Sequence, residues 1–258
     1  MPTGPFALTR RALLALAATP IVSACFGRQE AAAPSATGAR STAAASPTAS
    51  ASTAASQVAV PSCVVRPELT EGPYFVDEKL DRSDIRVDPS DGTTKDGAVL
   101  RLTMRVAQVS GSSCTALAGA IVDLWHCDAL GIYSDVSDPG FNTKGKKFLR
   151  GYQTTDANGR VQFVTVYPGW YQGRAVHVHF KIRSSAAAGA RSFTSQLFFD
   201  DALTDRVHAQ APYASKGQAR LRNSGDDIFR SSNDKLTLAV TQDGSGYAST
   251  FDIGVQLA

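Results

Sequence analysis

Two of the four histidines in this chain lie two residues apart, at His177 and His179, in the segment GWYQGRAVHVHFKI. In a β-strand, side chains at positions i and i+2 point to the same face, so these two imidazoles would lie side by side. The opposite face of the same strand carries only apolar side chains: Val176, Val178, Phe180 and Ile182. A His-x-His pair on a strand is typical of zinc, copper and iron sites, although hydrogen-bonded pairs without a metal are also common.

Two tyrosines sharpen the metal-binding interpretation of the histidine pair. Tyr133, in GIYS, follows a glycine just past a predicted strand, and Tyr171, in PGWY, lies in a Pro-Gly turn that leads into the histidine strand. No acidic or thiol cluster lies near the pair in the sequence, so the usual structural zinc patterns are missing. Two phenolates and two neutral imidazoles suit a hard, highly charged cation such as iron(III). Free tyrosine ionises near pH 10, so such a cation would be needed to keep it deprotonated.

Other histidine and aromatic residues have simpler interpretations. His126 lies beside Trp125, where a hydrogen-bonded structural role is favoured, and His208 is not expected to bind metal. Tyr74, in EGPYF, either lines a substrate pocket or packs within a turn. Tyr167 and Trp170 are candidate aromatic walls around the metal site.

The elements that must position these residues are predominantly β-strands. Alternating apolar and polar residues predict strands over 99–106, 119–126, 159–166, the histidine segment, 191–199, 235–242 and 247–257. Turn signals such as Asn158-Gly159 separate the strands. One short helical turn is expected over 202–207, and the charge-rich segment 77–86 is expected to be a solvated loop. These short strands predict an all-β fold, a sandwich or a barrel.

The N-terminal part of the chain differs from the rest. Residues 1–24 combine Arg10 and Arg11, an apolar stretch and small residues before Cys25, which predicts an export signal peptide. VSAC resembles a bacterial lipobox, so Cys25 is expected to carry a lipid; an ordinary signal peptide cut elsewhere is the alternative, and the Sec or twin-arginine route is left open. Residues 25–61 are rich in Ala, Ser and Thr without a periodic apolar face, which predicts a disordered tether. The folded domain then spans 62–258.

Charge and cysteine content limit the partners and the compartment. The formal charge of +3 falls to 24 − 23 = +1 once residues 1–24, with two arginines and no acids, are removed. A nearly neutral domain argues against nucleic acid as a partner. Export permits disulfides, and Cys63 with Cys114 is the favoured pair, leaving Cys127 as a buried thiol, although other pairings stay open.

Four segments together resemble the intradiol ring-cleavage dioxygenases, a family of non-haem iron(III) enzymes: LTEGPYF, GAIVDLWHCDALGIYS, RGYQTTDANGRVQFVTVYPGWY and GRAVHVHFKI. The resemblance implies a single catalytic β-sandwich domain of mostly antiparallel strands with long active-site loops. It implies one Fe(III) per chain and four ligands: Tyr133, Tyr171, His177 and His179. It further implies that Tyr133 accepts a substrate proton, that Arg174 stabilises negative charge on the substrate, and that Gln196 orients a ligand or substrate oxygen.

The implied reaction is cleavage of a catechol by O2 between its two hydroxyl-bearing carbons, giving a cis,cis-muconate-type dicarboxylate. The connection from Tyr171 to His177 is shorter than in well-known members, and Ala175 stands where the family usually has proline. The helical dimerisation segment of catechol 1,2-dioxygenases has no counterpart, because the tether occupies its position. The choice among catechol, hydroxyquinol, protocatechuate and lignin-derived catechols is therefore open, as is the oligomeric state.

Two alternative functions use the same residues differently. The first is a non-catalytic β-sandwich binding module at the cell surface, in which the iron site has lapsed. The second is an exported zinc or copper protein that binds metal through His177 and His179 alone. The colour of the iron-loaded protein and the metal affinity of Tyr171→Phe separate these alternatives from the iron enzyme.

Overall fold

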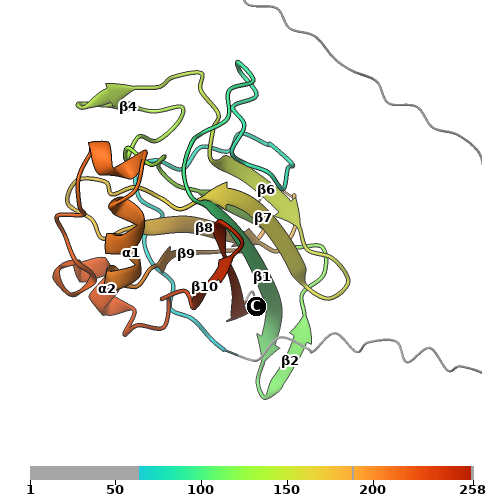
Figure 1. The fold of residues 1–258 in the computed structure, drawn as a ribbon. Helices are drawn as coiled ribbons and strands as arrows, with labels where there is room; N and C mark the ends of the chain where they lie inside the picture. Colours follow the sequence, from blue (N-terminus) through green and yellow to red (C-terminus); the bar gives the residue numbers. More distant parts are fainter. Residues whose placement is uncertain (1–63, 188, 257–258) are drawn as a thin grey trace, which may run out of the picture. The chain divides into compact units, whose positions relative to one another are not determined.

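The computed structural model describes residues 64–187 and 189–256 (Figure 1). The signal peptide 1–24, the tether 25–61, Cys25 and Cys63 lie outside the described residues. Within the described part the strands are β1 (Val99–Ser110), β2 (Ser113–Ala116), β3 (Ile121–Trp125), β4 (Ser137–Asp138), β5 (Phe141–Asn142), β6 (Arg150–Thr154), β7 (Arg160–Val166), β8 (His177–Arg183), β9 (Ser192–Phe198), β10 (Val240–Asp243) and β11 (Gly246–Val255).

The longer strands form two sheets. The first has the order β10-β11-β1-β2, and β7 also pairs with β1; the second, here called sheet B, has the order β6-β3-β8-β9. Neighbouring strands are antiparallel except for β1 and β11, which run parallel. Strands β4 and β5 form a separate hairpin. The mostly antiparallel, all-β fold is confirmed.

One hydrophobic core joins the two sheets into a sandwich. Strand β1 alternates as its sequence predicts, and four of its apolar side chains are buried: Leu100, Leu102, Met104 and Val106. On β8 the predicted apolar face is buried in the same core through Val178, Phe180 and Ile182, each with no exposed surface. The other face of β8, with the two histidines, therefore points away from this core.

The described helical elements all fall between β9 and β10. They are α1 (Asp201–His208), the 3₁₀ turns η1 (Tyr213–Ser215) and η2 (Asn223–Gly225), and α2 (Asp227–Ser231), with both α-helices on the same side of the strands in Figure 1. The helical turn expected over 202–207 is confirmed as α1, which begins after Asp200, whose side chain accepts a hydrogen bond from the amide of Leu203. No helix in the described part is long and apolar enough to cross a membrane.

One prediction about local structure is wrong and another is incomplete. The strand predicted over 235–242 is reduced to β10, and before it Thr237 only forms an isolated bridge with Phe198. The segment 77–86 is more than a solvated loop, because Ile85 is fully buried and the guanidinium of Arg82 donates to the carbonyl oxygens of Val87, Lys147 and Arg150. This charge-rich segment therefore also contains one core residue, Ile85, and one arginine, Arg82, that donates hydrogen bonds to main-chain carbonyl oxygens. Strands β2 and β6 and the β4–β5 hairpin were not predicted.

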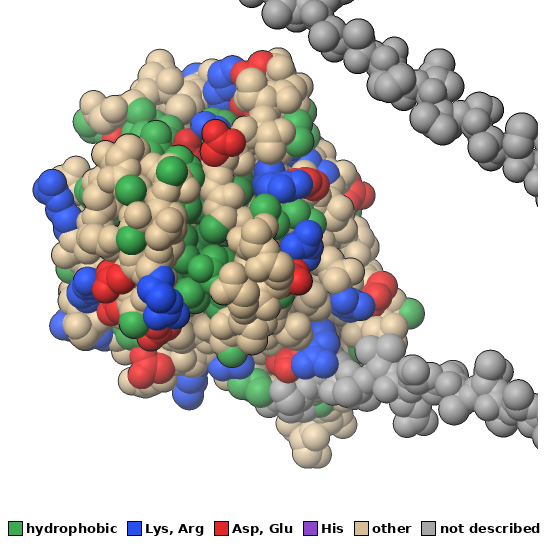
Figure 2. All heavy atoms as spheres, viewed as in Figure 1, with side chains coloured by type: hydrophobic (Ala, Val, Ile, Leu, Met, Phe, Trp, Pro, Cys, Tyr) green, Lys and Arg blue, Asp and Glu red, His purple; other side chains and the backbone are tan. Residues whose placement is uncertain are grey.

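The cysteines agree with the sequence analysis as far as they are described. Cys114 is disulfide-bonded, and Cys127 is a free, buried thiol. Pairing with Cys63 stays a prediction, since that residue lies outside the described range. Figure 2 shows basic and acidic side chains interspersed over one face of the molecule, so no extended field of one sign forms there.

Candidate active site

One row of side chains crosses all four strands of sheet B. Arg150 on β6 lies opposite Trp125 on β3, Trp125 opposite His179 on β8, and His179 opposite Gln196 on β9. Directly opposed residues point to the same face of a sheet, so this row lies on the face away from the core. The Trp125 and His179 rings stack, with centroids 5.0 Å apart and planes 9° from parallel. The strand register therefore places the histidine pair between an aromatic wall and an amide.

The two imidazoles face each other through their Nε2 atoms, which lie 2.9 Å apart. Nδ1 of His177 lies 2.7 Å from the carbonyl oxygen of Ala175, so Nδ1 carries the hydrogen and Nε2 presents a lone pair. Burial lowers the pKa of His177 to about 3. Burial, together with the neighbouring imidazole of His177, holds the pKa of His179 well below its ordinary value. Both imidazoles are therefore neutral, as metal ligands must be.

Tyr133 is a third potential ligand at the same point. Its hydroxyl lies 3.3 Å from Nε2 of His177, and its side chain is buried, with 1% of its surface exposed. Burial raises the pKa of this phenol well above 10, while the guanidiniums of Arg174 and Arg150 act in the opposite direction. A phenolate here would thus require an additional cation, which a metal beside the imidazoles would provide.

Tyr171 lies beside these three groups, but its hydroxyl has other partners. The Tyr171 and Tyr133 ring centroids are 5.7 Å apart. The Tyr171 hydroxyl donates to Oδ2 of Asp138 at 2.9 Å and lies 2.5 Å from the Tyr74 hydroxyl, which also contacts Asp138. Burial raises the pKa of Tyr171. Tyr171 and Asp138 also line a cleft of about 660 Å³. The structure therefore brings three of the four predicted ligand atoms together and leaves the fourth at a carboxylate by the cleft.

The two tyrosine loops, residues 126–136 with Tyr133 and residues 167–176 with Tyr171, are packed against each other. Oδ1 of Asp128 accepts from the amides of Leu130 and Ile132, which shapes the turn before Tyr133. A Cβ on Gly169 would overlap the carbonyl oxygen of Ala129, so the Pro-Gly turn before Tyr171 needs glycine to approach this loop. Sequence reasoning noted the turn residues but not this contact.

Lys216 joins the same two loops and was not singled out in the sequence. Its Nζ donates to the carbonyl oxygen of Leu130 at 2.5 Å and to that of Trp170 at 2.8 Å. It also lies over the Trp170 ring, 4.2 Å from the centroid. One ammonium group therefore fixes a carbonyl three residues before Tyr133 and another immediately before Tyr171.

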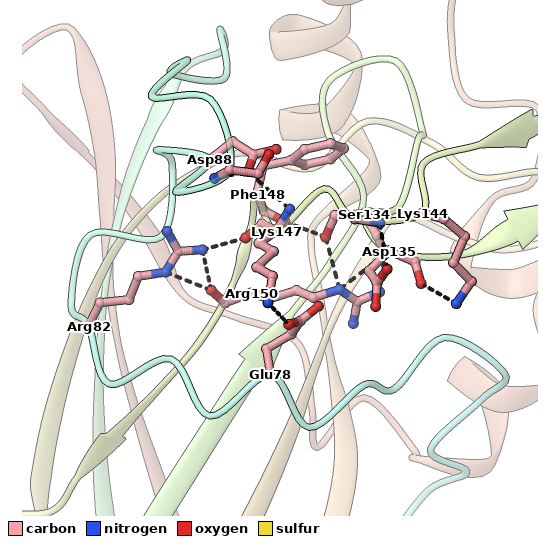
Figure 3. A network of polar contacts seen from close by, with 11 residues as sticks. Glu78, Arg82, Asp88, Ser134, Asp135, Lys144, Lys147, Phe148 and Arg150 are labelled. Carbon is pink, nitrogen blue, oxygen red and sulfur yellow. Dashed lines mark hydrogen bonds and ion pairs between the residues drawn. The ribbon is translucent and has the colours of Figure 1, made fainter.

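Arg150 is hydrogen-bonded to Ser134, the residue that follows Tyr133 (Figure 3). Its guanidinium donates to the backbone oxygen of Ser134 at 2.6 Å, to the Ser134 hydroxyl at 2.9 Å and to the backbone oxygen of Tyr74 at 2.6 Å. Burial lowers the pKa of Arg150 to about 10, so the group stays charged at neutral pH. Arg150 thus links β6 to both the Tyr133 loop and the segment that carries Tyr74.

Arg174 and Gln196, the other predicted catalytic residues, are in direct contact. Nη2 of Arg174 donates to Oε1 of Gln196 at 2.6 Å, and Nε2 of Gln196 donates to the carbonyl oxygen of Thr70 at 2.9 Å. Nε of Arg174 donates to the buried carboxylate of Asp226, which sequence reasoning missed. Because Gln196 lies directly opposite His179, its contact with Arg174 places the guanidinium beside the candidate site.

The structure confirms some of the predictions made for the remaining histidine and aromatic residues and contradicts others. His126 is hydrogen-bonded at both ring nitrogens, to the Cys127 carbonyl oxygen and the Thr165 hydroxyl, so its structural role is confirmed. His208 lies against the carbonyl oxygen of Pro168. Tyr167 does not line the site, because it is buried in the core with its hydroxyl on Thr204. Trp170 lines the cleft beside Tyr171, and Tyr74 reaches Tyr171 directly.

The converging groups fit a hard cation. Two neutral imidazoles and one buried phenol direct Nε2, Nε2 and a hydroxyl oxygen at one point, and Nδ1 of His179 is buried without a hydrogen-bond partner among the described residues. In the same part of the chain, no three His, Cys, Asp or Glu side chains form a group that could hold a metal. Any metal at this point would therefore depend on the phenolic oxygens, which are ligands suited to iron(III).

Comparison with known proteins decides the family. Residues 70–253 match a protein-family model described as Dioxygenase, and this span contains every residue of the candidate site named above. The chain belongs to the intradiol ring-cleavage dioxygenases. This is a family of oxidoreductases.

The relatives with established names include catechol 1,2-dioxygenase 2 of Acinetobacter lwoffii. It is 34% identical over 154 residues, which cover 52% of this chain and 51% of that protein. Catechol 1,2-dioxygenase 1 of the same organism is 27% identical over 203 residues, covering 67% of this chain and 61% of that protein. The chain thus spans about half to three fifths of the length of these curated relatives.

Solved structures match over most of the intradiol dioxygenase domain. An intradiol ring-cleavage dioxygenase from Tetranychus urticae superposes with a TM-score of 0.66 at 29% identity, covering 76% of this chain and 96% of that one. The dioxygenase domain of a dioxygenase–carbohydrate-binding protein fusion from Streptomyces sp. SirexAA-E gives a TM-score of 0.53 at 27% identity, covering 76% and 100%. These likenesses agree with the sandwich described above.

Proposed function

We propose that this intradiol dioxygenase binds one iron(III) per chain and cleaves a catechol-type substrate between its hydroxyl-bearing carbons, using O2, to a cis,cis-muconate-type dicarboxylate. The observation that carries the proposal is the convergence of the Nε2 atoms of His177 and His179 with the hydroxyl of Tyr133, beside Tyr171. The names of the relatives support catechols as the substrate class.

The protein groups around this point have separable tasks. His177, His179, Tyr133 and Tyr171 would hold the ion, whose Lewis acidity would ionise the catechol and make its ring reactive toward O2. Arg174 would place positive charge where negative charge develops on the substrate. Gln196 would fix the orientation of that guanidinium through the contact at Nη2.

The contacts of the two tyrosines favour Tyr171 over Tyr133 as the group that accepts a substrate proton. Tyr133 is fully buried against His177, whereas Tyr171 is half-buried at the cleft. Once protonated, the Tyr171 hydroxyl would donate to Oδ2 of Asp138, the contact that the structure contains. Hydrogen bonding holds the pKa of Asp138 below its usual value, so the carboxylate stays ionised and can accept it.

Oxygen uptake with product analysis tests this function. The full chain, loaded with iron, should consume O2 with at least one of catechol, hydroxyquinol, protocatechuate or a lignin-derived catechol. The product should be a ring-opened dicarboxylate in which ¹⁸O₂ labels both new oxygens. Iron-loaded protein that consumes no oxygen with any of these compounds would overturn the proposal.

Colour and one tyrosine variant separate the alternatives. Tyrosinate-to-iron(III) charge transfer should make the loaded protein reddish, whereas a colourless protein favours the binding module. Tyr171→Phe should change this absorption and weaken iron binding, while Tyr152→Phe, on β6 away from the candidate ligands, should change neither. A zinc or copper protein that uses only the histidines would tolerate Tyr171→Phe without loss of metal affinity.

We further propose that the chain is exported and anchored by a lipid on Cys25. The paired arginines, the apolar stretch and VSAC support this proposal. In a bacterial host the wild-type chain should incorporate a labelled fatty acid and sediment with membranes. Cys25→Ala should abolish both, and a chain that remains in the cytoplasm without label would overturn the proposal.

A further inference from the structure

Asp226 uses its two carboxylate oxygens for two different purposes. Oδ1 accepts from the backbone amides of Ile228 at 2.8 Å and Phe229 at 3.3 Å, which caps the start of α2. Oδ2 accepts from Nε of Arg174 at 2.9 Å and from the backbone amide of Ala175 at 2.8 Å. Asp226, at the start of α2, is thus hydrogen-bonded to the two residues Arg174 and Ala175 that precede β8.

Capping alone does not explain a charged side chain at this position. Asn, Ser and Thr also cap helices well, and α2 has only five residues. The Asp226 side chain is 2% exposed, and burying a carboxylate is costly unless it is paired. Burial alone would raise the pKa of Asp226, but the amide of Ala175 and the guanidinium of Arg174, its charged partner, hold that pKa below its usual value. The negative charge of Asp226 is therefore explained by its contacts with Arg174 and Ala175, and not by the helix cap.

The hydrogen bond from Nε of Arg174 to Asp226 fixes the direction of the Arg174 guanidinium. Nε is held by Asp226 and Nη2 by Gln196, so two of its three nitrogens have a fixed partner. Arginine has many rotamers, and each side-chain torsion fixed before the substrate arrives lowers the ordering cost during the reaction. The amide of Ala175 is held by the same oxygen, and the carbonyl of Ala175 orients His177.

We propose that Asp226 is a positioning residue for ring cleavage: by binding Nε of Arg174 and the amide of Ala175, it aims the guanidinium at the substrate. This inference rests on the proposed function. Asp226 does not touch the substrate, and its effect passes through Arg174. Loss of these two hydrogen bonds should slow the reaction without removing the metal.

The test uses Asp226→Asn in the full, iron-loaded chain. Asn keeps an oxygen for the helix cap, but its amide group cannot accept hydrogen bonds from both Arg174 and Ala175. We expect kcat to fall by about 10- to 100-fold, as misplacing a catalytic group typically does, while iron content, the charge-transfer band and KM stay nearly unchanged. Asp226→Ser, which also caps without a charge, takes its place if the Asn variant does not fold.

Asp200→Asn is the matched control. Asp200 caps α1 by accepting from the amide of Leu203, and it is exposed. The same substitution there alters a helix cap alone, so kcat should stay at the wild-type level. Equal losses in the Asp226 and Asp200 variants, or a loss explained by missing iron, would overturn the inference.

A measurement without iron separates this inference from the proposed function. In metal-free, ¹⁵N-labelled protein, the Nε–H of Arg174 should exchange slowly with water because Asp226 binds it, and Arg174→Lys identifies the signal by its loss. Exchange should accelerate in Asp226→Asn and stay slow in Asp200→Asn. If the Arg174 Nε–H exchanges as slowly in Asp226→Asn as in the wild type, Asp226 does not hold the guanidinium. If that hydrogen is protected in the wild type but the protein cleaves no catechol, only the proposed function is refuted.

A double variant shows whether the effect passes through Arg174. In an Arg174→Lys background, which lacks the Nε–H, adding Asp226→Asn should reduce kcat little further. A full additional loss in that background would mean that Asp226 acts independently of Arg174, and the positioning role would be wrong.

Discussion

Gly72 lies directly against His179: a Cβ on Gly72 would be 3.3 Å from Cε1 of the imidazole and 4.0 Å from Nε2. The φ angle of Gly72 is +75°, which also strains any L side chain. We expect Gly72→Ala to push the His179 ring from its place and to weaken iron binding by about tenfold or more, as outer contacts of metal ligands typically do. Titration of the metal-free chain with chelator-buffered iron measures this.

Gly92→Ala separates crowding from backbone strain. Gly92 has the same φ of +75°, but nothing lies within 4 Å of a Cβ placed there. Both substitutions should therefore cost about 1–2 kcal/mol of backbone strain. Only Gly72→Ala should change iron affinity, and equal affinities in the two variants would show that the glycine contact does not position His179.

Lys216→Met should loosen both tyrosine loops. The substitution leaves the carbonyl oxygens of Leu130 and Trp170 without their ammonium donor, while the apolar stem of the side chain is kept. We expect a loss of about 1–3 kcal/mol in the free energy of unfolding by urea, together with faster amide exchange in both loops. Iron should dissociate faster, because Tyr133 and Tyr171 are held less firmly.

Lys146→Met is the control for removing a lysine. Its Nζ forms an exposed ion pair with Asp91 rather than with a carbonyl oxygen of either tyrosine loop, and exposed pairs contribute little to stability. This variant should unfold and bind iron like the wild type. If Lys216→Met behaves the same way, the lysine does not hold the loops.

The parts of the site that the sequence predicted share a local signal. The alternation in β8 separates the histidine face from the core face, and burial follows that division. Tyr133 and Tyr171 were recognised from short motifs beside turns, and the chain folds these turns together. Tyr167 shows the limit of such signals: it lies next to the same Pro-Gly turn, yet its hydrogen bond to Thr204, 37 residues away, draws it into the core.

The supporting residues could not be predicted because their contacts cross long stretches of chain. Asp226 is 52 residues from Arg174, Lys216 is 86 from Leu130, and Arg150 is 76 from Tyr74. None of them belongs to a periodic pattern, and only Arg150 lies in a segment that carries the family resemblance. Their role appears only when the topology brings a helix, two loops and an N-terminal segment around sheet B.

Arg150→Lys should damage the site although it conserves charge. The planar guanidinium reaches the carbonyl oxygens of Ser134 and Tyr74 from two separate nitrogens, Nη2 and Nη1, whereas a lysine carries all its donors on one atom. We expect a loss of roughly 3 kcal/mol in the free energy of unfolding, because buried acceptors and a buried charge lose their partners. The charge-transfer band of the iron-loaded protein should also shift, since Tyr133 precedes Ser134.

Arg105→Lys provides the comparison for Arg150. Arg105 pairs with Asp252 on the parallel strands β1 and β11, where both side chains remain partly exposed. The substitution should cost less than about 1 kcal/mol and leave the absorption unchanged. A similar small cost for Arg150→Lys would mean that the lysine reaches the same carbonyl oxygens.

The pH dependence of stability should report the buried His126. Burial lowers the pKa of His126 to about 4, because the folded interior disfavours the charged imidazolium. The unfolded chain binds that proton near pH 6.5, so it holds more protons than the folded chain between these values. Stability is therefore fully present above pH 6.5 and is lost as the pH falls toward the folded pKa.

For His126 alone, the expected loss between pH 7 and pH 5 is about 2 kcal/mol in the free energy of unfolding. Urea unfolding of the metal-free chain at both pH values measures it, and His126→Asn should show a pH-dependent loss smaller by that amount, because the other buried histidines titrate in both proteins. Thr165→Val removes the hydrogen-bond partner but keeps the imidazole buried, so it should be less stable at both pH values with the wild-type pH dependence. If His126→Asn loses as much stability as the wild type between the two pH values, His126 is not held neutral by the fold.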